Sequence, residues 1–445
     1  MSRLGWIWRS MPGALALAAL LAVVSPAHAI PAFARQTGQN CVSCHAGGQY
    51  PELTPYGRLF KMTGYTIGQR ATVPAAIMVE GSMASMKNTA AVNNSLTNNT
   101  GAGLPTPVDS GTPVADVASL FLGGKITNNF GAFAQYTWDF HGAADDAGNN
   151  TKTHGSADNM DFRFADHIIT PSQDFIYGLS LNNNPSVSDP WNTSWAWAQY
   201  VPASGGIGAN SFLDAAAPYP GSGLPGDLYA GLTAYAYWQK TIYAELGVYH
   251  TAKGLFHFFN ANNDPTASVL HGSNNPYWRL AYTRDWGAHS LMVGTEGMYA
   301  HPYDTTNGVD YGDVQSYQSV KSIGIDSQYQ YLLDPHTVTA QVMLQHQTQY
   351  PSFLDANING TVPATVTTFR AKGSYVYRAF VGGAAAIFNA SGDPSIATRG
   401  AMLEAFVLPV QNIRVGLQYT MFSRLPGVDH PSDANTLFFY VWAAY

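Results

Sequence analysis

The sequence predicts an all-β fold, an antiparallel β-barrel of about sixteen strands, and three observations predict it. Charged residues make up only 11% of the 445 residues, whereas 13% are aromatic and 43 are glycine. Segments in which apolar and polar residues alternate recur from residue 72 to the end of the chain. The connections between these segments alternate between short and long. Outer-membrane barrels combine these features, because one strand face meets lipid and the other a wet lumen.

Three segments show the alternation clearly: 130–140, 337–345 and 412–421. Short turns are expected at Asn128-Asn129, Pro171-Ser172, Gln239-Lys240, Asp285-Trp286, Asp334-Pro335 and Gly382-Gly383. Long polar loops are expected near 89–114, 141–157, 183–226, 251–275, 301–315, 349–364 and 425–434. We therefore predict a porin-like barrel over residues 72–445. A soluble β-sandwich would also alternate, so the short and long connections are what favour the barrel.

The two ends of the chain indicate export to an outer membrane. Residues 1–29 resemble a secretory signal peptide, with basic Arg3 and Arg9, a short apolar stretch and an Ala27-His28-Ala29 cleavage site. The last residues alternate apolar side chains and end in Tyr445, like the assembly signal of outer-membrane barrels. An even strand count puts both termini on the periplasmic side of a Gram-negative outer membrane. The formal charge of −7 argues against nucleic acid as a partner.

Between the signal and the barrel lies a single chemical motif, Cys41-Val42-Ser43-Cys44-His45, which contains both cysteines of the chain. The spacing C-x-x-C-H is the attachment signal of c-type haem. The two thiols lie one helical turn apart and can each form a thioether with one porphyrin, and His45 then serves as proximal iron ligand. A zinc site would need about four ligands, and a thioredoxin-like pair would need a βαβ context. We therefore expect one covalent haem c.

The haem-bearing segment, residues 30–71, is too short to be stable without further packing. We expect it to fold into the lumen as a plug, because a sixteen-stranded barrel has room for one. Thr54 and Pro55 predict a helix start, Tyr56 to Met62 the helix, and Gly64 its end.

Arg35, Arg58 and Lys61 form a basic cluster that is expected to contact the haem propionates. The alternative is that these side chains are solvated or pair with Glu52. Met62 is a candidate distal iron ligand, although a methionine is more often packing filler. Other candidates are Met78, Met83, Met86 and the histidines that face the lumen.

Two further features of the barrel sequence concern its lumen. The loop 183–226 contains Asp189-Pro190-Trp191-Asn192, Trp195 and Trp197, which either fold inward as a constriction or lid, or form a surface cluster. Four carboxylates are expected to face the lumen, where they either attract a cation or line a wet wall: Asp139, Glu245, Glu296 and Asp326.

The haem segment resembles the N-terminus of the fused cytochrome–porins. The resemblance lies in Phe33-Ala34-Arg35-Gln36-Thr37-Gly38, the C-x-x-C-H motif, Pro51-x-Leu53 and Tyr56-Gly57-Arg58-x-Phe60-Lys61-x-x-Gly64-Tyr65. It implies an outer-membrane monohaem cytochrome joined to a sixteen-stranded barrel, and several members oxidise extracellular Fe(II). This chain departs from many iron-oxidising members at residues 46–50, where they carry an aromatic residue and a Gln-His pair. The resemblance therefore does not identify the electron donor of this chain.

Three functions follow as expectations. The first is transfer of electrons from an extracellular donor, with Fe(II) as one candidate, through the enclosed haem to a periplasmic carrier such as a soluble cytochrome c. The second is a diffusion porin whose haem segment is a structural or sensing plug. The third is a haem enzyme such as a peroxidase, which would need an open iron position. The first is favoured, because a barrel can carry a redox centre through an insulating bilayer.

Overall fold

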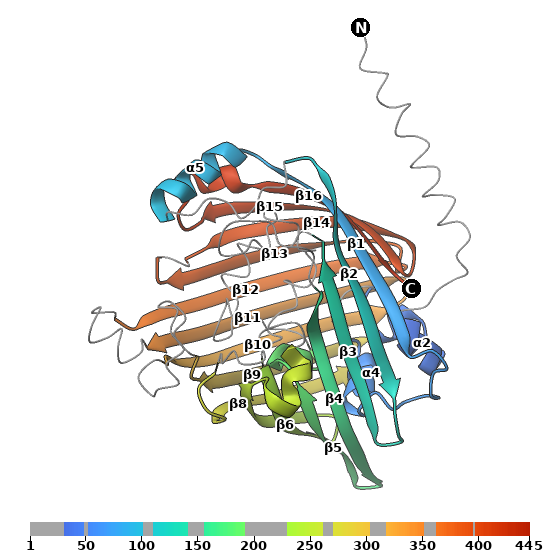
Figure 1. The fold of residues 1–445 in the computed structure, drawn as a ribbon. Helices are drawn as coiled ribbons and strands as arrows, with labels where there is room; N and C mark the ends of the chain where they lie inside the picture. The colour runs from blue at the N-terminus through green and yellow to red at the C-terminus, as the bar shows by residue number, and fades with distance from the viewer. Residues whose placement is uncertain are drawn as a thin grey trace.

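A computed structural model describes residues 31–48, 52–100, 110–140, 155–191, 229–260, 270–302, 317–350, 362–394 and 397–445. The expected signal peptide lies outside the described residues. The strands form one closed barrel in which each strand pairs with its sequence neighbours and β1 pairs with β16 (Figure 1). All sixteen pairings are antiparallel, so the predicted fold class is confirmed.

The strands are β1 (Ala75–Met86), β2 (Pro113–Lys125), β3 (Phe130–Asp139), β4 (Gly155–Thr170), β5 (Gln173–Asn182), β6 (Tyr229–Trp238), β7 (Ile242–Thr251), β8 (Asn275–Trp286), β9 (His289–Ala300), β10 (Ser319–Leu333), β11 (His336–Tyr350), β12 (Ala364–Tyr377), β13 (Val381–Gly392), β14 (Arg399–Val410), β15 (Ile413–Arg424) and β16 (Thr436–Ala444). The helices are α2 (Pro31–Thr37), α3 (Cys41–Cys44), α4 (Pro55–Met62), α5 (Thr89–Thr100) and α6 (Pro185–Ser188), with 3-10 turns η3 (Gly254–Asn260) and η5 (Pro431–Ala434). Among the described residues, none of the helices has the length and apolar character to cross a membrane.

The two ends of the barrel differ in their connections. At one end, here called the short-turn end, the strands are joined by residues 126–129, 171–172, 239–241, 287–288, 334–335, 378–380 and 411–412. The other end, the long-loop end, carries the longer connections. Two expected turns are displaced: Asp285-Trp286 ends β8, and Gly382-Gly383 lies in β13. In both cases strand pairing extends to the residues next to the true turn.

Helix α5 was not predicted, because its residues were expected to form part of a long polar loop. It begins where the Asn88 side chain accepts a hydrogen bond from the Ala91 backbone N–H, as residues that cap a helix do. Val92 is fully buried, and with Leu96 it packs on the apolar cluster that includes Phe422 and Val428. Tertiary packing therefore forms this helix from a sequence of weak helix formers.

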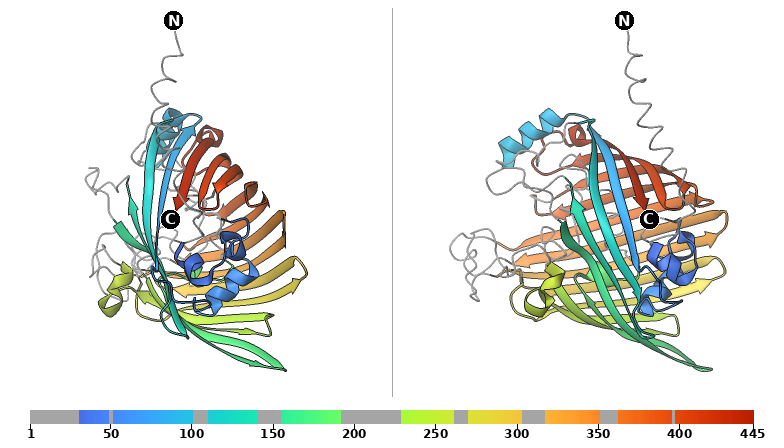
Figure 2. Two further views of the ribbon diagram at one scale, coloured as in Figure 1. Left: turned by 90° about the vertical axis from the view of Figure 1, so that its right-hand side faces the viewer. Right: turned by 45° about the vertical axis from the view of Figure 1, so that its right-hand side comes forward.

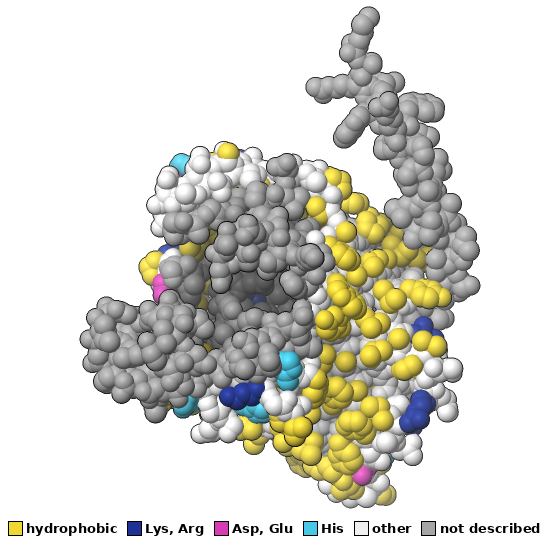
Figure 3. All heavy atoms as spheres, viewed as in Figure 1, with side chains coloured by type: hydrophobic (Ala, Val, Ile, Leu, Met, Phe, Trp, Pro, Cys, Tyr) yellow, Lys and Arg dark blue, Asp and Glu magenta, His cyan; other side chains and the backbone are white. Residues whose placement is uncertain are grey.

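The outer face of the barrel is apolar, whereas the inner face carries polar side chains together with apolar clusters such as that of Phe388, Met402 and Phe406. Exposed, outward-facing side chains include Ile77, Val79, Leu122, Leu246, Leu280, Val293, Ile323, Ile325, Ile387 and Leu403. Figure 3 shows how hydrophobic side chains cover the outer surface of the strands. Buried side chains on the inner face include Asp161, Arg163, Thr233, Arg279, Gln328, Gln330, Gln341, Gln345 and Gln418. The predicted alternation is confirmed: apolar side chains face outward, toward the region of lipid, and buried charged and amide side chains of the wall face inward.

Aromatic side chains gather at both ends of the outer face. Trp238 and Trp286 end strands at the short-turn end, and Tyr299 and Tyr350 lie where strands reach the long-loop end. Aromatic girdles of this kind mark the two membrane interfaces of outer-membrane barrels. The outer surface therefore has the character of a membrane-spanning barrel.

Candidate functional site

The N-terminal segment, residues 31–70, lies inside the barrel at its short-turn end. Figure 2 shows its helices within the curve of the strands. Lumen-facing side chains on β4, β9, β10 and β12 bind it through hydrogen bonds or ion pairs. The described parts of this segment, residues 31–48 and 52–70, therefore lie in the lumen, and a haem held there stays a prediction.

The C-x-x-C-H motif forms one helical turn. Cys41 and Cys44 begin and end α3, and His45 follows with extended backbone. His45 pairs with Leu53 in an isolated bridge, which closes the loop between them. The Cys41 side chain is 1% exposed, and its sulfur lies 3.6 Å from the Gln411 carbonyl oxygen in a short turn of the barrel. Burial first, and the neighbouring Cys41 second, raise the pKa of the Cys44 thiol to about 11, so the unmodified thiol is protonated at neutral pH.

Helix α4 packs directly against α3. The Thr54 side chain caps α4 by accepting from the Gly57 backbone N–H, and Pro55 takes the first helical position. A Cβ atom at Gly57 would lie 2.2 Å from the Cys44 carbonyl oxygen, so only glycine allows this approach. Gly64, with φ of +72°, follows the helix end in the left-handed conformation. The predicted helix and both of its ends are confirmed.

Arg58 fixes α4 to the barrel wall. It is buried and donates to the Ser290 hydroxyl at 2.7 Å, to the side chains of Gln330 and Gln328 at 3.0 and 3.1 Å, and to the Leu53 carbonyl at 2.7 Å. Burial lowers the pKa of Arg58 to about 10, against the opposing effect of nearby acids, and the side chain keeps its charge at neutral pH.

The other predicted basic residues also have protein partners. Lys61 is buried and donates to the Asp189 carbonyl at 3.0 Å, and burial, followed by the charge of Arg163, lowers its pKa to about 8. Arg35 is exposed and donates to the backbone carbonyls of Val73 and Ala75. Contact of these residues with haem propionates stays a prediction.

Glu52 pairs with the barrel rather than with the basic cluster. Its carboxylate forms an ion pair with Lys372 on β12, and both side chains are buried. The alternative of a solvated cluster, or of one paired with Glu52, is therefore wrong for Arg58 and Lys61. Sequence reasoning missed Lys372, because its position beside residue 52 depends on how the segment sits in the closed barrel.

A second buried network holds the end of α4. The Tyr65 hydroxyl donates to Asp161 at 2.5 Å, and Arg163 forms an ion pair with the same carboxylate oxygen at 2.6 Å. Arg163 also donates to the Ser188 carbonyl at 2.6 Å, and its guanidinium lies 5.0 Å from the ring centre of Tyr235. Tyr65 is buried, and burial together with Asp161 raises the pKa of its hydroxyl well above the usual value.

The chain after β5 folds into the lumen and meets the N-terminal segment. Helix α6 and the residues up to Trp191 are buried. Trp191 is fully buried and belongs to one apolar cluster with Met62, Tyr235 and Tyr243. The inward alternative is thus the correct one for residues 185–191, whereas Trp195 and Trp197 lie outside the described residues. Met62 contacts this wall cluster, and its role as distal ligand stays a prediction.

Arg279 neutralises two of the four lumen carboxylates named above. Its guanidinium forms ion pairs with Asp326 at 2.7 Å, Asp189 at 3.0 Å and Glu296 at 3.2 Å, and all four side chains are buried. Glu245 accepts a hydrogen bond from Tyr243 at 2.7 Å. Glu296 and Asp326 therefore fit neither of the two expected roles. Both are buried and paired with Arg279, so they neither attract a free cation nor line a wet wall.

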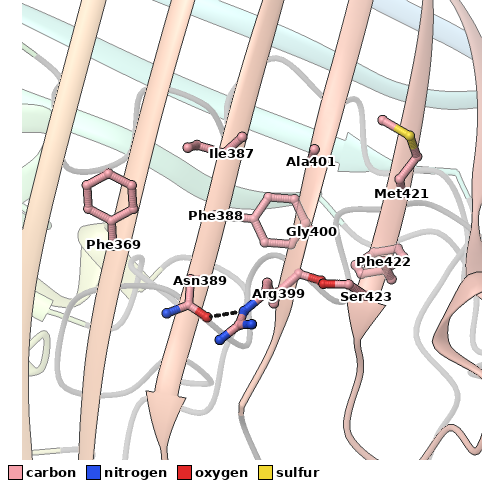
Figure 4. Close-up of a pocket in the computed structure, with 10 residues that line it drawn as sticks. All are labelled: Phe369, Ile387, Phe388, Asn389, Arg399, Gly400, Ala401, Met421, Phe422 and Ser423. Atoms are coloured by element: carbon pink, nitrogen blue, oxygen red, sulfur yellow. Dashed lines mark hydrogen bonds between the residues drawn. The ribbon is translucent and has the colours of Figure 1, made fainter.

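A groove of about 440 Å³ lies apart from this site, on the outer wall near the long-loop end. Its floor and sides include outward-facing Ile387, Ala401 and Met421, which lie opposite one another on β13, β14 and β15 (Figure 4). Arg399 donates to the Asn389 side chain at one edge, at 2.8 Å. The groove faces the region of lipid and contains none of the predicted site residues.

The donor set around α3 fits a covalently attached c-type haem. Two thiols one helical turn apart are followed directly by an imidazole, the arrangement that thioether formation and axial ligation require. Within the described part of the chain, no group of three or more His, Cys, Asp or Glu side chains is placed to hold a metal ion.

Fold and lumen contents together define a porin-like, membrane-spanning β-barrel with a folded N-terminal segment inside. No protein-family model matches the sequence, and the search of curated proteins found no match.

Several solved structures are similar to this chain. OmpF of Salmonella typhi, in complex with daunomycin, is 9% identical, covers 83% of this chain and 97% of its own, and has a TM-score of 0.42. The outer membrane channel DcaP of Acinetobacter baumannii is 10% identical over 83% and 96% of the two chains, with a TM-score of 0.44. A loop-deletion mutant of OmpT of Vibrio cholerae is 10% identical over 84% and 99%, with a TM-score of 0.41. The barrel itself is defined by its strand pairing.

Proposed function

We propose that this protein is an outer-membrane cytochrome that passes electrons between a donor at the long-loop end and a periplasmic carrier at the short-turn end. The observation that carries the proposal is the position of Cys41, Cys44 and His45, inside a closed barrel with an apolar outer surface. When bound, a c-type haem supplies one-electron oxidation and reduction. Cys41 and Cys44 would hold its porphyrin, and His45 would ligate its iron.

The protein's own contribution is a fixed position for the segment that carries the motif. Ion pairs and hydrogen bonds to four strands fix the segment, and the buried Trp191 cluster packs against α4. Fixed dipoles are among the means by which a protein sets the potential of a haem. A diffusion porin with a structural or sensing haem plug would hold the segment in the same way, and the second test below separates the two functions.

The first test is covalent haem. Full-length protein made with a c-type maturation system should retain haem through denaturing electrophoresis, and Cys41→Ala/Cys44→Ala should lose it. Heat-modifiable migration of both proteins would show that each barrel is folded. A folded wild-type barrel without covalent haem would overturn the proposal.

The second test concerns electron flow. Detergent-purified protein is mixed anaerobically with Fe(II), and dithionite gives the fully reduced reference. Reduced haem bands that appear with Fe(II) would support iron as donor, whereas reduction by dithionite alone would point to another donor. In proteoliposomes loaded with oxidised soluble cytochrome c, reduction of the trapped carrier by an external reductant would demonstrate the conduit. Free solute flux, with no transfer of electrons, would favour the diffusion porin.

A further inference from the structure

Two histidines face each other at the long-loop end, where the chain enters β8 and leaves β9. Leu270 and Pro302 form an isolated antiparallel bridge, and the next pair inward is His271 with His301, whose backbones are joined by a hydrogen bond of 2.7 Å. Both imidazoles also contact the ring of Tyr317, so the two side chains are neighbours.

The ring of Tyr317 contacts both imidazoles. It stacks on His271 with ring centres 4.2 Å apart and meets His301 edge to face at 5.4 Å. These ring contacts order both imidazole side chains.

Asn275 determines which nitrogen of His301 can act as a ligand. The buried Asn275 amide group donates to the Tyr249 carbonyl at 3.0 Å, and its oxygen accepts from the His301 backbone N–H at 2.7 Å. The same oxygen lies 3.3 Å from Nδ1 of His301. Because an amide oxygen only accepts, Nδ1 carries the proton and Nε2 carries the lone pair. Ligating histidines are commonly oriented by such a partner on their other nitrogen.

We propose that His271 and His301 form a two-imidazole site for a divalent transition-metal ion at the long-loop end of the barrel. Imidazole nitrogens suit Zn²⁺, Cu²⁺, Ni²⁺ and Fe²⁺, and water would complete the coordination of a site with two protein ligands. The site is built on strand ends β8 and β9 and does not depend on haem attachment at Cys41 and Cys44.

The test is equilibrium dialysis of Zn²⁺ against detergent-purified full-length protein without a polyhistidine tag. Wild-type protein should bind one Zn²⁺ that His271→Ala/His301→Ala does not. Each single variant should weaken this binding, because each removes one of the two imidazole ligands. In Cu²⁺ electron paramagnetic resonance, the wild-type spectrum should show two coupled imidazole nitrogens.

His346→Ala is the matched control, because His346 lies on β11 at the same end, with Nδ1 3.0 Å from the Thr367 hydroxyl. It should leave the Zn²⁺ site unchanged. Equal binding by wild type and the double variant would overturn the proposal. Repeating the titration on folded Cys41→Ala/Cys44→Ala protein separates the two proposals, since loss of haem should not abolish this metal site.

Discussion

At position 57 the absence of a side chain decides how closely two helices pack. The Cβ atom of an alanine would meet the Cys44 carbonyl oxygen at 2.2 Å, a distance that real contacts do not reach. We expect Gly57→Ala to force α4 away from α3 at a cost of about 1–3 kcal/mol. Hydrogen exchange of the amides in residues 41–62 should then be faster than in wild type. Gly373→Ala is the control, because nothing lies within 4 Å of its Cβ position, and unchanged exchange in Gly57→Ala would contradict the packing argument.

The Arg58 guanidinium links the N-terminal segment to the wall of the barrel. Its removal leaves the Ser290, Gln328 and Gln330 side chains without their charged donor. We expect Arg58→Ala to weaken docking of the segment by about 2–4 kcal/mol, which is measurable as faster limited proteolysis of residues 31–70.

Arg58→Lys should fail to restore protection, because a single ammonium group cannot reproduce the fork of donors that reaches several acceptors. Arg35→Ala is the matched control, since Arg35 is exposed and donates to the backbone carbonyls of Val73 and Ala75, where β1 begins. Proteolysis rates that are equal in Arg58→Ala and Arg35→Ala would show that the buried contacts contribute little.

At the scale of elements, the loop between α3 and α4 is tied to β12 by one buried ion pair. Breaking a buried pair by removal of one partner typically destabilises by about 3–5 kcal/mol, because the remaining charge stays buried. We expect Glu52→Leu to weaken the docking of the segment in the barrel by about this free energy. Lys372→Met in the same chain should restore most of the loss, and hydrogen exchange of all four members of the double-mutant cycle measures the coupling. Additive effects would mean that the pair contributes no coupling.

Elements differed in how far the sequence could predict them. The helix at 55–62 was predicted with its ends, because Thr54, Pro55 and Gly64 act through local backbone chemistry. Helix α5 and the inward course of residues 185–191 were not assigned, since both are formed by contacts with distant strands. The ion pairs of Arg279 reach β9, β10 and Asp189 at once, and no spacing within one strand reveals such a cluster.

At the scale of the whole molecule, lumen and wall were predictable because lipid and water sort side chains with a period of two. One prediction at this scale is that the N-terminal segment plugs the lumen. Deletion of residues 31–70 from the mature chain should leave a folded, heat-modifiable barrel, because the strand pairing closes without the segment.

We expect this deletion to raise single-channel conductance in planar bilayers above that of the full-length protein, since the segment fills the short-turn end. The control is Arg35→Ala, which keeps the plug. Equal conductance of deletion and full-length protein would show that the segment does not obstruct the lumen, and would favour a diffusion role.

The pairing of β1 with β16 sets the order of events during biogenesis. The first and last strands of the barrel meet through the mutual backbone hydrogen bonds of Ile77 and Tyr445 and the register beside them. The wall therefore seals only after all its strands are in place, around a segment that was synthesised before any of them. Cys41 is 1% exposed in the finished molecule, so under the proposed function we expect attachment of haem at its thiol to precede that sealing. We then expect a chain that inserts too early to trap an unmodified thiol.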